Sequence, residues 1–150
     1  SQAHRWRWLL AAAAVVYYFA GYNGRWVFTA DTGKYLVLAR NLAEGRGYIH
    51  PGGFHARASP GLPWLEAASL RLAGGEVWPV VLLFVLLGLL GLILAYRFLR
   101  LRLDERPGGI PGEAVVAAVM LTVTQVWYEA SHRLLADLPF AVGACLCFLA

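Results

Sequence analysis

The segment 77–96, "VWPVVLLFVLLGLLGLILAY", decides the fold class of this chain. It carries no charged residue, and its length matches the ~20 residues that a helix needs to cross about 30 Å of hydrocarbon. Over all 150 residues the chain is 59% hydrophobic and only 15% charged, which is too little charge to cover a soluble domain of this size. The sequence therefore predicts an all-α membrane protein.

Further apolar runs at 8–24, 113–129 and 134–150 bring the predicted number of transmembrane helices to about four. The first run follows the basic "HRWRW" and also fits a signal peptide, but bulky Phe28 makes a poor cleavage site before Asp31. We therefore interpret this run as an uncleaved first span. From Leu138 to Ala150 the last run is short for a full crossing, so we expect the chain to be the N-terminal part of a longer protein or an incomplete gene product.

Arginines near the ends of the predicted spans set the expected orientation. Arg5 and Arg7 precede the first span, and an arginine-rich loop over 97–106 follows the second. Both belong on the cytoplasmic side, so the loop 25–76 faces the periplasm or the exterior. We predict a multi-pass protein of the cell inner (cytoplasmic) membrane with a cytoplasmic N-terminus, in contact with membrane lipids. The net charge of +4 reflects this topology and gives no reason to expect a nucleic-acid partner.

The outer loop 25–76 begins with a predicted amphipathic helix over 31–44 that is too short to span the membrane. Its apolar side chains recur at i, i+3, i+4 and i+7, namely Tyr35, Leu38, Ala39 and Leu42. Asp31 is suited to cap the start of this helix, and Gly45 and Gly47 are suited to end it. A one-sided helix of this length is expected to lie in the membrane interface.

A second short helix is predicted to follow Pro63. It carries Leu65, Ala68, Ser69 and Leu72 on one side. The connector between the two interfacial helices, "GYIHPGGFHARASPGLP" (47–63), is so rich in Gly and Pro that we expect no regular secondary structure. The acids of the outer loop, which offset its basic residues, are Asp31, Glu44, Glu66 and Glu76.

This order of span, interfacial helix, loop, interfacial helix and span resembles the N-terminal module of the GT-C superfamily of membrane glycosyltransferases. The likeness is to the branch that contains the bacterial aminoarabinose/lipid A transferases and the protein O-mannosyltransferases. The segments that carry it are Asp31 after the first span, "YLVLARNLAEGRGY" (35–48), "SPGLPWLEAASLRLAGG" (59–75) and "SHRLLADLPFAV" (131–142). The resemblance covers essentially the whole chain.

The resemblance implies transfer of a sugar from a polyprenyl-phosphate-linked donor to a lipid, protein or glycan acceptor at the outer membrane face, with inversion. The family's first outer-loop acid takes the acceptor's proton as a general base, and Asp31 is the matching position. The family acid that contacts the acceptor or positions the first loop corresponds to Asp137. Arg57 and Arg133 are the cations expected to stabilise the leaving phosphate.

Three other residues are candidates for substrate binding, namely Tyr35, Tyr48 and Glu129. Tyr48 has the ring to stack on a sugar, but packing within the loop explains it equally well. Glu129 flanks the short outer turn 129–137 opposite Asp137. Both catalytic candidates also have a plain structural role, because an aspartate at a helix start caps the helix.

A divalent metal is left open by the sequence. In the aminoarabinose transferase branch an acid ahead of the loop proline helps to hold a metal, whereas Ala58 and Ser59 stand there in this chain. His50, His55 and His132 could join Glu129 as ligands, but their spacing does not resemble a compact site, and we interpret them as solvated or packing residues. Cys145 and Cys147 are two residues apart on a predicted helix, so they cannot bridge each other.

The alternative from another class is a small non-enzymatic membrane protein, such as a transporter subunit or an assembly scaffold for lipid-linked glycans. A transporter is expected to place charged residues or broken helices deep within its spans. In this sequence the charges gather at the edges of the apolar runs. This distribution favours chemistry at the membrane interface.

Overall fold

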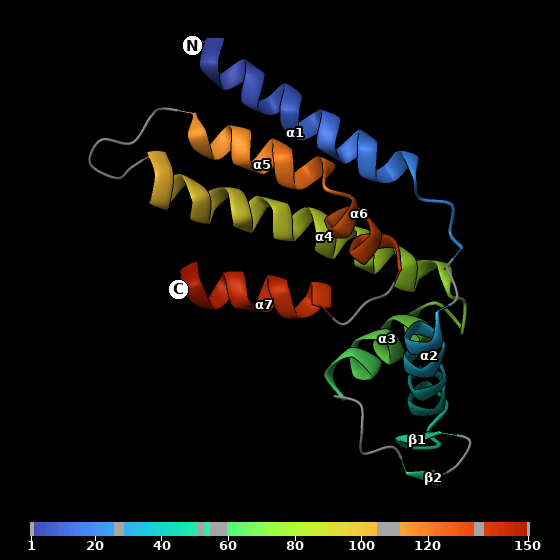
Figure 1. Cartoon of the computed structure of the whole chain (residues 1–150). Coiled ribbons are helices and arrows are strands. Elements are labelled where there is room, and N and C mark those ends of the chain that lie inside the picture. Colours follow the sequence, from blue (N-terminus) through green and yellow to red (C-terminus); the bar gives the residue numbers. More distant parts are fainter. Residues whose placement is uncertain are drawn as a thin grey trace.

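The computed structural model of the chain describes residues 2–25, 29–50, 53–54, 60–104, 112–133 and 137–149. The fold is all-α, as predicted, with one very short hairpin (Figure 1). The α-helices are α1 Gln2–Ala20, α2 Ala30–Ala43, α3 Gly61–Leu72, α4 Trp78–Leu99, α5 Glu113–Val123, α6 Gln125–His132 and α7 Asp137–Leu149. A π-helical turn, η1 Arg100–Asp104, extends α4, and strands β1 Ile49–His50 and β2 Gly53–Phe54 form the hairpin.

The long helix α4 is the element against which the others are arranged. Figure 1 shows α1, α5, α4 and α7 running side by side, with α2 and α3 beyond the N-terminal end of α4. The short helix α6 packs across α4 and links α5 to the start of α7. The chain therefore divides into a layer of roughly aligned helices and a compact helix pair at one end.

Among the described residues, α4 together with η1 is the one continuous helix that is long and apolar enough to cross a membrane. Helices α5 and α6 reach this length only as a pair, which is bent by 56°. The stretch Trp8–Ala20 of α1 and the whole of α7 are apolar but shorter. The structure thus contains the strongly apolar helix expected over 77–96, and the number of about four spans stays a prediction.

The predicted span 113–129 is interrupted at Thr124, whose backbone is extended (φ −67°, ψ 123°). Two threonines near the break turn their hydroxyls back onto the helix: Thr122 donates to the carbonyl of Ala118 (2.7 Å) and Thr124 to that of Met120 (2.8 Å). Such back-bonding weakens and bends helices. The break redirects the chain, so that α6 lies against α4.

The prediction of a loop directly after the second span is wrong for residues 97–104. Helix α4 continues to Leu99, and η1 carries the chain to Asp104. The Asp104 carboxylate accepts a hydrogen bond from the backbone N–H of Ala114 in α5 (3.1 Å), which satisfies one of the free donors at that helix start. Arg97, Arg100 and Arg102 therefore lie on a helical continuation of the predicted span, and the end of this continuation is attached to α5.

Glycines in α4 allow α6 to approach its backbone closely. A Cβ on Gly88 would lie 2.6 Å from the Cβ of Ser131, and one on Gly91 would lie 2.6 Å from the ring of Trp127. The indole N–H of Trp127 donates to the carbonyl of Gly88 (3.2 Å). The bend at Thr124 and these glycines together hold α6 against the first half of α4.

Candidate functional site

The start of α2 is capped by threonines, so the prediction that Asp31 caps this helix is wrong. The Thr29 hydroxyl accepts from the backbone N–H of Thr32 (3.2 Å), and the Thr32 hydroxyl accepts from that of Thr29 (2.7 Å). This reciprocal pair is a capping box, with Thr32 in the place usually taken by Glu or Gln. Asp31 lies between them in the first turn, with its side chain exposed. No hydrogen bond or ion pair joins it to another described residue.

The apolar stripe predicted for the first outer helix is confirmed. Leu38, Ala39 and Leu42 are buried and Tyr35 is partly buried. Beyond the helix Gly45 adopts a positive φ of 77°, which ends α2 as expected. The hairpin of β1 and β2 lies within the connector for which we expected no regular structure, so that expectation is wrong for residues 49–50 and 53–54.

Helices α2 and α3 are joined at the C-terminal end of α2. The Arg71 guanidinium of α3 donates through Nε to the carbonyl of Ala43 (2.9 Å) and through Nη2 to that of Leu42 (2.8 Å). These are carbonyls of the last turn, which have no partner within the helix. The Asn41 amide donates to the carbonyl of Ile49 (2.6 Å) and so attaches the hairpin to the same pair.

One cluster of buried side chains, here called the junction core, joins the helix pair to α4, α6 and α7. Its members are Leu36, Ala39, Leu42, Leu62, Ala67, Leu70, Val80, Val81, Phe84, Ala130 and Leu138. Four of the described catalytic and substrate-binding candidates pack on this core or adjoin one of its members in sequence, and Asp31 and Arg133 do not. Tyr35 and Tyr48 pack against it, Glu129 precedes Ala130, Asp137 precedes Leu138, and Asp31 precedes the buried Thr32 at the start of α2.

Tyr35 and Tyr48 are close enough to affect each other. Burial raises the pKa of the Tyr48 phenol, and the neighbouring Tyr35 raises it further. Both rings belong to the apolar surroundings of the junction core, which supports the packing role considered for Tyr48. The structure therefore brings these two candidates together.

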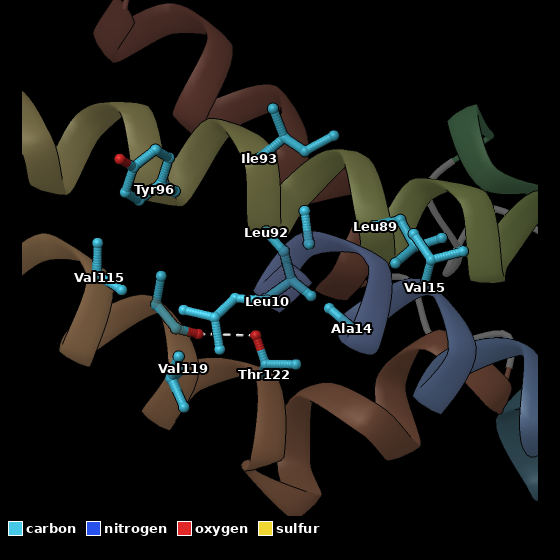
Figure 2. A pocket seen from close by; sticks show the side chains of 12 residues that line it. Leu10, Ala14, Val15, Leu89, Leu92, Ile93, Tyr96, Val115, Val119 and Thr122 are labelled. Atoms are coloured by element: carbon cyan, nitrogen blue, oxygen red, sulfur yellow. Dashed lines mark hydrogen bonds between the residues drawn. The ribbon is translucent and has the colours of Figure 1, made fainter. Parts of the chain in front are cut away.

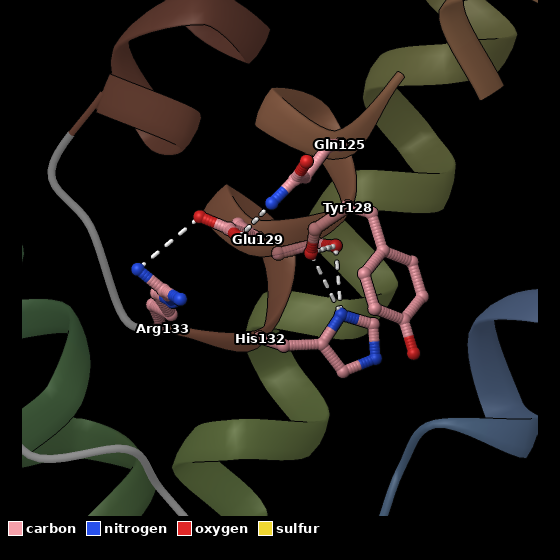
Figure 3. Close-up of polar contacts among 6 residues, drawn as sticks. Gln125, Tyr128, Glu129, His132 and Arg133 are labelled. Atoms are coloured by element: carbon pink, nitrogen blue, oxygen red, sulfur yellow. Dashed lines mark hydrogen bonds and ion pairs between the residues drawn. The ribbon is translucent and has the colours of Figure 1, made fainter. Parts of the chain in front are cut away.

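Glu129 and Arg133 form an ion pair with each other (Figure 3). The Arg133 guanidinium lies 3.2 Å from a Glu129 carboxylate oxygen, and the amide of Gln125 donates to the same carboxylate (2.8 Å). All three residues lie on one face of α6 or just after it, at the i, i+4 spacing that brings side chains together. Arg133 is therefore a cation that already has an anionic partner on its own helix.

His132 connects α6 to α1. Its Nδ1 lies 2.8 Å from the carbonyl of Tyr128, and its Nε2 lies 3.2 Å from the carbonyl of Tyr18 near the end of α1. Its ring stacks on that of Tyr128, with centroids 4.2 Å apart (Figure 3). These contacts support the interpretation of this histidine as a packing residue.

Two candidates, His55 and Arg57, lie outside the described residues. Within the described ranges no three His, Cys, Asp or Glu residues are grouped in a way that could hold a metal ion. Cys145 and Cys147 are free thiols.

Glu66 of α3 is a buried acid, whereas the sequence predicted one of the ordinary charges of the outer loop. Its side chain is 0% exposed, and neither carboxylate oxygen has a hydrogen-bond partner among the described residues. Burial raises the pKa of Glu66 to about 8, so the carboxyl group is largely protonated at neutral pH. A signal was present: Glu66 is four residues from both Leu62 and Leu70, so it lies on the buried face of α3.

Residues 54–150 of the chain match the family described as dolichyl-phosphate-mannose-protein mannosyltransferase. The chain belongs to this family, whose members are membrane-integral glycosyltransferases of the GT-C type. No curated protein and no solved structure matches the chain.

Proposed function

We propose, with membership of this family as the premise, that the chain takes part in transferring a sugar from a polyprenyl-phosphate-linked donor to a lipid, protein or glycan acceptor. We place the reaction at the outer face of the cytoplasmic membrane, beside the junction core. The observation that carries the proposal is the convergence of α2, α3, α6 and α7 on one end of α4. The helices that bear Asp31 and Asp137, α2 and α7, both contribute side chains to this core.

Asp31 is the proposed general base. Its carboxylate is exposed in the first turn of α2. It accepts the proton of the acceptor hydroxyl as the oxygen forms a bond to the anomeric carbon. The bond from that carbon to the phosphate oxygen breaks, and polyprenyl phosphate leaves with the electron pair. Attack from the opposite side inverts the anomeric centre.

The remaining candidates support binding. Asp137, exposed in the first turn of α7, is proposed to hold the acceptor or the first outer loop. Arg57 is the proposed partner of the leaving phosphate. Arg133 is the weaker choice for that role because its guanidinium is already paired with Glu129.

The surface of α3 fits a site at the boundary between lipid and water. Trp64, Leu65 and Leu72 are exposed on this helix, Leu72 to 91%. Exposed apolar side chains on a short helix are expected where its face lies in the headgroup region. We therefore propose that α2 and α3 lie in the outer interface, above about four spans, where a membrane-embedded donor and an aqueous acceptor meet.

The test is a transfer assay in membranes from cells that express the protein, with labelled polyprenyl-phosphate sugars as donors. Asp31→Asn should lower transfer about 10²- to 10⁴-fold, the usual contribution of general base catalysis. The matched control is Glu44→Gln, an exposed acid just beyond the other end of α2 that pairs with Arg46. Full turnover by Asp31→Asn would contradict the base role. Movement of lipid-linked sugar across vesicles without transfer would instead favour a transport or scaffold protein.

A further inference from the structure

A cavity lies between α1, α4 and α5, on the half of α4 that is remote from the junction core (Figure 2). It has a volume of about 230 Å³ and is lined by side chains such as Leu10, Ala14, Leu92, Ile93 and Tyr96. This is smaller than the roughly 300–1,000 Å³ of pockets that hold drug-sized molecules, so it suits one slender chain. Leu10 and Ile93 are also exposed, so the cavity opens to the surface.

The lining is apolar, with few groups that could hold water. The one threonine hydroxyl of the lining, that of Thr122, already donates to the carbonyl of Ala118. Cavities with such walls stay dry and take up apolar ligands. For a membrane-integral chain, the apolar group at highest local concentration beside this opening is a lipid acyl chain.

Basic residues mark one end of this cavity. The lining positions Leu89, Ile93 and Tyr96 form a stripe on α4 that continues, at a spacing of four residues, to Arg97 and Arg100. Arg97 is exposed and forms no ion pair with a described residue. Arg102 lies on another face, because its guanidinium carbon is 5.5 Å from the centre of the Phe98 ring, which packs against Phe148 of α7.

The described acids at this end are engaged within the protein. Asp104 accepts a hydrogen bond from the backbone N–H of Ala114, and Glu113 interacts within the protein, as does Arg100. Since α4 is helical through Leu99, Arg97 is presented on an ordered element. An exposed guanidinium group beside an apolar cavity complements an anionic headgroup with an acyl tail.

We infer that this cavity is a binding site for an anionic phospholipid, with one acyl chain between α1, α4 and α5 and the phosphate at Arg97. The site lies on the C-terminal half of α4, whereas the helix that bears Asp31, α2, packs near the N-terminal end of α4. It rests on the membrane-integral character of the family and not on the transfer reaction, so the two proposals can fail separately.

The test uses the full chain in phosphatidylcholine nanodiscs that contain a small fraction of phosphatidylglycerol with a diazirine in one acyl chain. After irradiation, mass spectrometry of the digested protein should locate adducts on lining residues such as Leu10, Ala14 and Leu92. Unlabelled phosphatidylglycerol should compete for these adducts, and unlabelled phosphatidylcholine should not. Labelling spread evenly over exposed apolar side chains such as Trp8 and Val16 would overturn the inference.

Two sets of variants sharpen this test. Arg97→Gln should lower specific labelling about fivefold, whereas Arg40→Gln, an exposed arginine on α2, should not change it. Ala118→Leu should block labelling by filling the cavity, with helix content checked by circular dichroism. Equal labelling by a phosphatidylcholine probe would contradict the site. So would displacement of the label by polyprenyl phosphate, which would assign the cavity to the sugar donor.

Discussion

The two halves of α4 are packed in different ways. In the first half, Gly88 admits α6 to the helix backbone, and Val80, Val81 and Phe84 are buried in the junction core. In the second half the neighbours across the gap are α1 and α5, whose small alanines leave the cavity unfilled. The comparison shows how one apolar helix serves two purposes. Where the facing side chains interdigitate, the helix fixes a site, and where they do not, it leaves room for a ligand.

The largest expected effect at the packed end concerns Glu66. Its pKa is about 8 when folded against an ordinary value of 4.5, so the folded chain binds the extra proton between these limits. The free energy of unfolding should therefore fall as pH rises from about 4.5 to about 8, by at most about 1.4 kcal/mol per pH unit. Denaturant unfolding in detergent micelles at several pH values measures this slope.

Glu66→Leu should remove the slope and stabilise the chain most at pH 8. Glu76→Gln is the matched control, because this acid is exposed just after α3 and its loss should leave the slope unchanged. A slope that persists in Glu66→Leu would show that another group is responsible.

A smaller effect is expected where α6 meets α4. Gly88→Ala places a methyl group 2.6 Å from the Cβ of Ser131, so α6 must shift. Overpacking of this kind costs about 1–3 kcal/mol. Gly143→Ala in α7 is the control, since a Cβ there meets nothing within 4 Å. Equal thermal stability of the two variants in detergent would contradict the close approach of α6.

The cap of α2 is expected to contribute less. Thr29→Ala removes the hydroxyl that accepts from the Thr32 N–H and should cost about 1 kcal/mol. Asp31→Ala loses only an interaction with the helix dipole and should cost about half of that. Unfolding measured side by side for the two variants decides which residue caps the helix, and a larger loss for Asp31→Ala would reverse the assignment.

The smallest effect is expected at the exposed pair on α6. Glu129→Gln keeps the side-chain shape and removes the ion pair with Arg133, which should change stability by less than about 0.5 kcal/mol. In the transfer assay the same variant frees Arg133. A gain in donor binding, seen as a lower KM, would assign Arg133 to the phosphate, and an unchanged KM would leave Arg57 as the proposed cation.

The sequence predicted correctly those features of the fold that depend on one helix alone. Hydropathy identified α4, and periodicity identified the buried stripe of α2, because both depend on residues close together in the chain. The cap of α2 was misassigned since Thr29 and Asp31 are both good capping residues, and the reciprocal bond with Thr32 decides between them. The break at Thr124 could not be predicted in this way, because no Pro or Gly lies near it in the sequence.

The candidate site was predictable only in its parts. Asp31 and Asp137 were chosen from a family resemblance, and their roles remain proposals. The common core to which their helices contribute joins residues far apart in sequence, such as Leu36 and Leu138, which no local pattern encodes. Glu66 was missed because an isolated charge in a loop is ordinarily solvated, and only the packing of α3 shows its burial.

Accessibility labelling in intact cells tests the central claim most directly, namely that the two ends of α4 face opposite sides of the membrane, with Asp31 outside. In a background with Cys145→Ser and Cys147→Ser, Asp31→Cys and Arg102→Cys are each treated with a maleimide that cannot cross the membrane. We predict that Asp31→Cys is labelled in sealed cells and Arg102→Cys only after permeabilisation. Labelling of both variants from the same side would contradict this account.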